Sequence, residues 1–226
     1  MDTRTREQLG AATGLAAVAL LGVNFIIGLS PKPPSLNAGV APVAAFVAQN
    51  KDALHVEILL TSLSMLFFLW FLGSVRVAVR NGEGGAGRIS GIVSGGGIVG
   101  AAFVLLAMVF YAAASLHPGL VLPGITHTLV DLGALCLGMG TAAFAVMYLG
   151  VAVVSLMDGG GLPKLIGWLS LIAGALALVG LVAVFNDDGI FAADGAFGYW
   201  ARYGAFVLWT LVVSGMLVQN PPKRRR

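Results

Sequence analysis

The chain has 226 residues, of which 58% are hydrophobic and only 10% are charged, and its mean hydropathy is +0.93. Ordinary globular domains carry about 25% charged residues, so this composition excludes an ordinary soluble domain and predicts a protein that folds in lipid. The net charge of +3 comes from basic residues beside apolar runs, which is typical of membrane topology and not of nucleic-acid binding.

Apolar runs long enough to cross a membrane follow one another along the chain. A helix rises 1.5 Å per residue, so about 20 apolar residues cross the hydrocarbon core. The runs lie at residues 9–29, 56–79, 90–115, 127–156, 164–185 and 203–219. The breaks between them are rich in Gly, Pro, Asn or Asp, which end helices. We therefore expect an all-α, polytopic membrane protein: a six-transmembrane-helix bundle that forms a single domain over residues 1–226.

The longest break lies between the first two spans and is too short for a core of its own. Its second half has Pro42 near the start of a helical pattern and Val43, Phe46 and Val47 on one face. This pattern predicts a short amphipathic helix over residues 40–50 that lies on the outer membrane surface.

Basic residues set the predicted orientation. Of the 13 Lys and Arg residues, all but Lys32, Lys51 and Arg202 fall on one side of a six-span arrangement. The side that is richer in Lys and Arg is cytoplasmic. We therefore expect both termini in the cytoplasm and a multi-pass protein of the bacterial cytoplasmic membrane.

The second span and the turn after it carry a recognisable run of residues. They read F-L-W-F-L-G-S-V-R at residues 68–76 and E-G-G-A-G-R-I-S at residues 83–90, with Arg80 between them. This run resembles the signature of an uncharacterised bacterial six-span membrane protein family, known only as a domain of unknown function. The resemblance implies a fold but no activity, so no catalytic residue follows from it.

Arginines surround the same turn. Arg76 and Arg80 lie four residues apart and share a helical face, while Glu83 can pair with Arg80 or with Arg88. One interpretation is a charge-locked hairpin between the second and third spans. The other is a lipid-headgroup site formed by Arg76, Arg80 and Arg88, with anionic phospholipids on the cytoplasmic side as the partner.

Glycines recur at steps of four along the third span, at Gly87, Gly91 and Gly95, with Gly96 and Gly100 beside them. Small residues at this spacing let helices approach closely. The pattern predicts tight packing within the chain, in preference to a homo-oligomer interface.

Polar side chains inside the spans fall at a common depth near the outer face. Odd-numbered spans run outward and even-numbered spans run inward. Residues near the end of an odd-numbered span therefore lie at the same membrane depth as residues near the start of an even-numbered span. Glu57, Thr61 and Ser64 also form one stripe on the second span. Charged groups within spans are costly and mark functional sites. We therefore predict an outward-facing pocket lined by Asn24, Glu57, Thr61, Tyr111, His127, Asp131, Arg202 and Tyr203.

Several functions would suit such a cluster. The first is binding or transport of a small polar or amphipathic ligand, with Glu57 and Asp131 as charge partners and Arg202 as an anion clamp. A purely structural network of ion pairs and helix caps is the alternative. A third is a metal-dependent membrane hydrolase in which His55, His127 and Asp131 hold zinc, or a haem site between the two histidines. A non-catalytic accessory subunit of a larger membrane complex is the last. Because no catalytic motif is present, we favour binding or transport over an enzyme and predict no cofactor.

Overall fold

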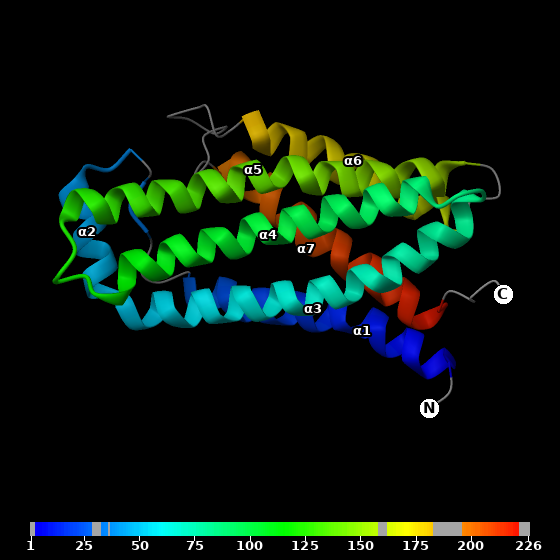
Figure 1. Ribbon diagram of the computed structural model, residues 1–226, viewed down its shortest axis with the longest axis horizontal. Coiled ribbons are helices and arrows are strands. Elements are labelled where there is room, and N and C mark those ends of the chain that lie inside the picture. Colours follow the sequence, from blue (N-terminus) through cyan, green and yellow to red (C-terminus); the bar gives the residue numbers. More distant parts are fainter. Residues whose placement is uncertain (1–2, 29–32, 36, 158–161, 183–195, 222–226) are drawn as a thin grey trace.

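The computed structural model describes residues 3–28, 33–35, 37–157, 162–182 and 196–221, and gives only the backbone of residues 3, 182 and 196–202. These residues form helices and no strand. The helices are α1 (Thr3–Gly28), α2 (Val40–Gln49), α3 (Lys51–Glu83), α4 (Arg88–Leu116), α5 (Pro123–Leu156), α6 (Lys164–Val182) and α7 (Ala196–Gln219). The predicted all-helical bundle is confirmed, with the long helices side by side and α2 across one end (Figure 1).

The long helices form a closed ring. Apart from the short α2, each helix packs against the next one along the chain, and α7 returns to pack against α1. Helix α1 starts and helix α7 ends at one end of the bundle, which we call the terminus end, whereas α2 lies at the opposite end, the α2 end (Figure 1). Successive long helices are therefore antiparallel.

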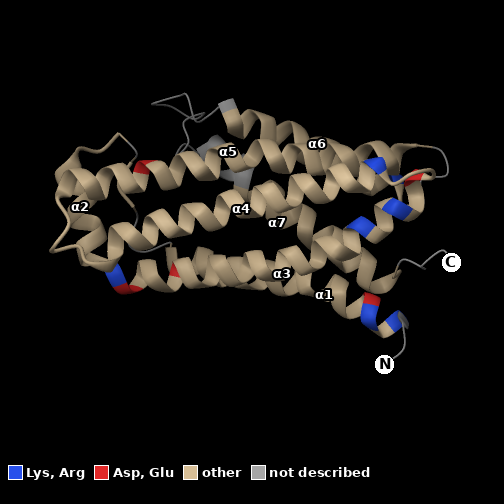
Figure 2. Ribbon diagram, viewed as in Figure 1, with Lys and Arg blue, Asp and Glu red and all other residues tan. Residues whose placement is uncertain are grey.

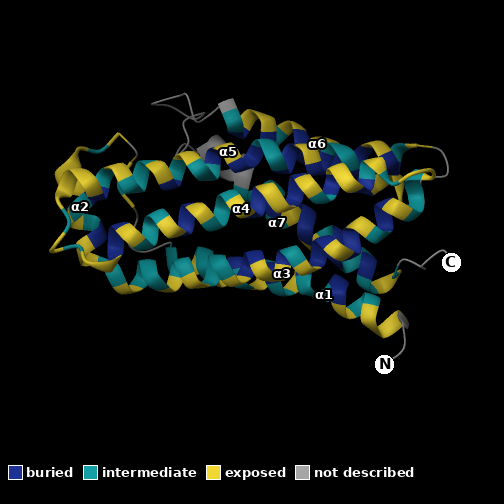
Figure 3. Ribbon diagram, in the orientation of Figure 1, coloured by how far each residue is buried: buried dark blue, intermediate teal, exposed yellow. Residues whose placement is uncertain are grey.

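The outer surface of the bundle is apolar. Among the described residues, the segments that are long and apolar enough to cross a membrane are five: Arg4–Gly28, Lys51–Glu83, Arg88–Leu116, Pro123–Leu156 and Lys164–Leu181. Large side chains such as Trp70 (72% exposed) and Trp168 (56% exposed) point outward, and buried residues gather where helices face one another (Figure 3). A surface of this kind needs lipid around it. The chain is thus a multi-pass membrane protein.

Aromatic side chains fill the interior of the helical bundle. Two rings come from each of three helices: Phe68 and Phe71 from α3, Phe144 and Tyr148 from α5, and Phe206 and Trp209 from α7. The ring centroids of Phe68 and Phe206 lie 4.9 Å apart, and those of Tyr148 and Trp209 lie 5.1 Å apart. Trp209 Nε1 donates a hydrogen bond to Ser170 Oγ at 2.8 Å, so its polar atom is satisfied in the apolar core. These rings fix α7 against α3 and α5.

Glycines bring α4 and α5 into direct contact. A Cβ on Gly96 would lie 2.7 Å from the carbonyl oxygen of Ala143, and one on Gly100 would lie 2.8 Å from the Phe144 ring. The predicted packing within the chain is confirmed for these two glycines. Gly91 and Gly95, in contrast, have nothing within 4 Å of an added Cβ and lie exposed on the outside of α4.

Helix α2 packs on the end of the bundle. Its Val43 and Val47 are buried and the helix contacts α5, α3 and α4. Only Asn50 separates α2 from α3, and both its backbone N–H and its side-chain amide donate to the Phe46 carbonyl oxygen. Because this link is so short, α2 stays on the bundle, and these two valines face protein and not lipid.

Candidate functional site

Charge is distributed unevenly between the two ends of the bundle (Figure 2). The basic residues at the terminus end, by their places in α1, α3, α4 and α6, are Arg4, Arg6, Arg76, Arg80, Arg88 and Lys164. At the α2 end, Lys51 is the one basic residue with a described side chain, and α3 and α5 bring Asp52, Glu57 and Asp131 to this end. The side chain of Arg202, the predicted anion clamp, lies outside the described residues. Among the described side chains, carboxylates therefore outnumber basic groups at the α2 end.

Helices α1 and α3 meet along an antiparallel contact that we call the α1–α3 seam. At the terminus end, a Cβ on Gly10 would lie 2.7 Å from Ser74 Oγ. In the middle, Ser64 Oγ donates to the Ala17 carbonyl oxygen at 2.9 Å. The seam is thus closed by small residues at one end and by a side chain to backbone hydrogen bond at its centre.

Toward the α2 end the seam becomes polar. Asn24 Nδ2 donates to Thr61 Oγ1 at 3.1 Å. Gly28 follows Asn24 by four residues and Glu57 precedes Thr61 by four, so these two form the next rung of the seam, one helical turn further on. A Cβ on Gly28 would lie 3.5 Å from Glu57 Oε1. The Glu57 carboxylate is therefore turned toward the backbone of α1.

Two polar groups of this seam have no partner among the described residues. The half-buried Glu57 carboxylate makes no hydrogen bond or ion pair with them, and Asn24 Oδ1 is buried and accepts no hydrogen bond. Buried polar atoms are nearly always bonded, and a charge within a span is costly. An unpaired carboxylate beside an unpaired amide oxygen is therefore the strongest candidate for a binding site. We call this pair, with Thr61 and Gly28, the Glu57 site.

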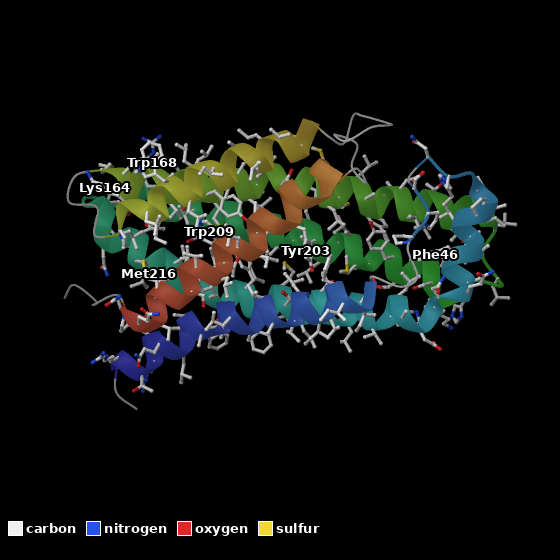
Figure 4. The ribbon with its side chains drawn as sticks, turned by 180° about the vertical axis from the view of Figure 1, so that it is seen from behind. Phe46, Lys164, Trp168, Tyr203, Trp209 and Met216 are labelled. Carbon is white, nitrogen blue, oxygen red and sulfur yellow. The ribbon has the colours of Figure 1, made fainter. Side chains whose placement is uncertain are left out.

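Helix α7 borders the same region through Tyr203, which lies nearer the α2 end than Trp209 and Met216 (Figure 4). Tyr203 OH donates to the Leu21 carbonyl oxygen at 3.0 Å, and its ring centroid lies 6.5 Å from that of Phe25. Leu21 precedes Asn24 by three residues, so Tyr203 holds α7 against α1 within about one turn of the Glu57 site.

The other predicted residues belong to a second contact group on α4 and α5. His127 Nδ1 lies 2.9 Å from Asp131 Oδ2, and His127 Nε2 lies 3.0 Å from the Ala38 carbonyl oxygen. Both ring nitrogens face oxygen acceptors, so an imidazolium donates to both, whereas a neutral ring donates to one. This arrangement, the His127 clamp, ties α5 to the segment before α2. The Tyr111 ring covers Gly133, where a Cβ would lie 2.5 Å from Tyr111 Cε1.

The structure does not assemble the predicted metal ligands. Among the described residues, no group of three or more His, Cys, Asp or Glu side chains could hold a metal ion. His127 and Asp131 are paired with each other, and His55 on α3 does not join them in such a group. Cys136 is a free, partly buried cysteine.

The predicted pocket residues with described side chains are thus divided between two contact groups, one at the α1–α3 seam and its border with α7, the other on α4 and α5. Sequence reasoning missed three partners in these groups, which are Gly28, the Leu21 carbonyl and the Ala38 carbonyl. A missing side chain and two backbone oxygens carry no residue-type signal that could have identified them.

At the terminus end, the turn between α3 and α4 is held by contacts among its own residues. Arg80 contacts Glu83 at 3.2 Å and donates to the Gly85 carbonyl oxygen at 2.7 Å. Glu83 in turn accepts hydrogen bonds from Ser90 N at 2.9 Å and Ser90 Oγ at 2.8 Å. The carboxylate occupies the N-terminus of α4, where an anion would otherwise bind. The turn matches the charge-locked hairpin interpretation.

Fold and site together define a class: a multi-pass α-helical membrane protein in which a carboxylate of a candidate span has no partner among the described residues. Comparison of the chain with protein-family models, with curated proteins and with solved structures gives no match. The resemblance to an uncharacterised six-span family stays a prediction.

Proposed function

We propose that this protein binds a small polar ligand at the Glu57 site, for transport or sensing. The observation that carries the proposal is the Glu57 carboxylate, which has no partner among the described residues although it is half-buried in a span. Removing a charge from water is repaid only when a partner is present. A ligand that pairs with Glu57 would supply that partner.

We also propose that the chain crosses the bacterial cytoplasmic membrane six times, with both termini in the cytoplasm. The sixth crossing would be α7, which closes the ring against α1. Two observations support this orientation: α1 starts and α7 ends at the same end of the bundle (Figure 1), and most of the described basic residues lie at that end (Figure 2). Basic flanks face the cytoplasm. In this orientation the Glu57 site faces outward.

Anionic phospholipid of the cytoplasmic leaflet is the proposed lipid partner. Because Arg80 is engaged by Glu83 and Gly85, the residues that remain for headgroups are Arg76 and Arg88, both exposed. Exposed arginines at this level attract anionic lipid.

Substituted-cysteine labelling tests whether the Glu57 site opens outward. In a Cys136→Ala background, Gly28→Cys places a thiol beside the carboxylate while leaving Glu57 intact, because its Cβ would be at ordinary contact distance. Ser74→Cys, at the other end of the same seam and buried, is the matched control. A membrane-impermeant maleimide added outside intact cells should label Gly28→Cys and leave Ser74→Cys unlabelled.

Both cysteines should react once the protein is denatured, which shows that the thiols are present and reduced. A Gly28→Cys thiol that reacts only after denaturation would contradict the proposed function, because the site would then be closed to the outside.

A further inference from the structure

We infer that the ligand of the Glu57 site is a small monovalent cation, either an alkali metal ion or a protonated amine. This inference rests on the proposed function and adds the chemical class of the ligand. Three observations support it. They are the atoms of the site that have no partner among the described residues, the positions of the described basic side chains, and the spacing of the two rungs.

The unpartnered atoms are hydrogen-bond acceptors. Glu57 contributes two carboxylate oxygens, and Asn24 contributes the buried Oδ1. The amide nitrogen of Asn24 is already used, since it donates to Thr61 Oγ1. Tyr203 OH donates to the Leu21 carbonyl oxygen. An ion or an ammonium group that offers only positive charge and donors matches these atoms, whereas an anion is repelled.

None of the described basic side chains is placed to act as the positive partner of the Glu57 carboxylate. All except Lys51 belong to the terminus end of the bundle. Lys51 lies six residues before Glu57 on α3, and at 3.6 residues per turn this separation places the two side chains on different faces of the helix. The site therefore keeps one net negative charge among its described side chains, which suits one monovalent cation. Divalent ions such as Ca²⁺ take six to eight oxygen ligands, usually with several carboxylates.

The two rungs of the site lie close together along the seam. Gly28 has no side chain where the Glu57 carboxylate approaches α1. The Asn24–Thr61 and Gly28–Glu57 rungs are one turn apart, which is about 5.4 Å along the helix. A charged N–H···O bond is about 2.8 Å long, so one ammonium nitrogen between two oxygens spans about 5.6 Å. The spacing of the rungs is therefore similar to the span that one small cation bridges between two oxygens.

The experiment measures melting temperatures of the full-length protein in an uncharged maltoside detergent at fixed chloride concentration. The added salts are sodium, potassium, methylammonium and choline chloride, the last as a cation that is too large. Sodium acetate and acetamide provide an anion and a neutral polar solute. Ligands that bind the folded state raise its melting temperature, and above the Kd the rise grows with the logarithm of the ligand concentration.

We expect the melting temperature to rise with the logarithm of the sodium or potassium concentration if the ligand is an alkali ion, and with that of methylammonium if it is an amine. The rise should disappear in Glu57→Gln and persist in Asp131→Asn, whose carboxylate is paired with His127. Gly28→Val provides a second variant that keeps the charge but fills the space beside it, and it should also lose the rise.

Three results would overturn the inference. An equal rise in wild type and Glu57→Gln would be a general salt effect. A Glu57-dependent rise with acetate or acetamide and not with cations would reject the cation class while leaving the proposed function intact. If no probe shifts the wild type, the inference fails; if Gly28→Cys is also closed to labelling, the proposed function fails with it.

Discussion

The α1–α3 and α4–α5 seams are both antiparallel helix contacts, yet they are held together in different ways. Between α4 and α5, glycines come from both helices. Gly96 allows the two backbones to touch, and Gly150 packs directly under the Val93 side chain. Between α1 and α3, hydrogen bonds join the helices at Ser64 and Asn24, and the row ends at the Glu57 carboxylate, which has no partner in the described part of the chain. The first seam is filled by close packing around glycines, whereas the second retains polar atoms that have no partner among the described residues. This difference distinguishes the seam that stabilises the bundle by packing from the seam at which we propose that a ligand binds.

The largest effect should come from adding volume to the glycine seam. Gly96→Val would place side-chain atoms 2.7 Å from the Ala143 carbonyl oxygen and 2.8 Å from Met147 N, and backbone cannot move aside as a flexible side chain can. We expect a loss of about 3 kcal/mol in the free energy of unfolding. Gly28→Ala, whose Cβ meets Glu57 Oε1 at 3.5 Å, should change it by less than about 0.5 kcal/mol. Thermal unfolding in detergent measures both, and similar losses would remove the distinction between the seams.

A smaller effect should follow from removing one hydrogen bond of the polar seam. Ser64→Ala deletes the bond to the Ala17 carbonyl oxygen and should cost about 1 kcal/mol, the usual range for interhelical hydrogen bonds in membranes. Ser94→Ala is the control, because Ser94 Oγ bonds to the Ser90 carbonyl oxygen within its own helix. If both variants unfold at the same temperature, the Ser64 bond does not stabilise the α1–α3 seam.

The sequence predicted where the helices lie better than it predicted the residues at which they begin and end. The second span was expected at residues 56–79, whereas α3 runs from Lys51 to Glu83. Hydropathy reports only the part of a helix that lies in hydrocarbon, and the helix continues until a cap or glycine stops it, here at Gly84 with φ 63°. Asn50 begins α3 directly after α2, which no apolar run could indicate.

The sequence predicted the level of Glu57 and Asp131 along the bundle but not which neighbouring helix each side chain faces. Alternating spans fix the level of Glu57 and Asp131, and both lie toward the α2 end. Which neighbour each one faces depends on the order of helices in the ring, which the hydropathy pattern does not contain. Glu57 therefore faces Gly28 on α1, while Asp131 is paired with His127 on its own helix.

The paired carboxylate at the α2 end should behave as a structural group. Asp131→Asn weakens the His127 clamp, and because the Asp131 side chain is 42% exposed, we expect a loss of only about 0.5 kcal/mol. Hydrogen–deuterium exchange should become faster in residues 37–49, which the clamp holds against α5. His117→Gln, an exposed histidine at the end of α4, should leave this exchange unchanged. Unchanged exchange in Asp131→Asn would show that the clamp does not hold α2.

The free energy of unfolding of Glu57→Gln, measured in detergent without added ligand and compared with wild type, tests the central claim most directly. If the Glu57 carboxylate has no partner in the folded chain, the neutral amide should leave the free energy of unfolding unchanged or raise it, because an unpaired charge no longer has to be buried. A loss of more than about 1 kcal/mol, as expected when a bonded carboxylate is removed, would show that Glu57 serves the fold and would contradict the account.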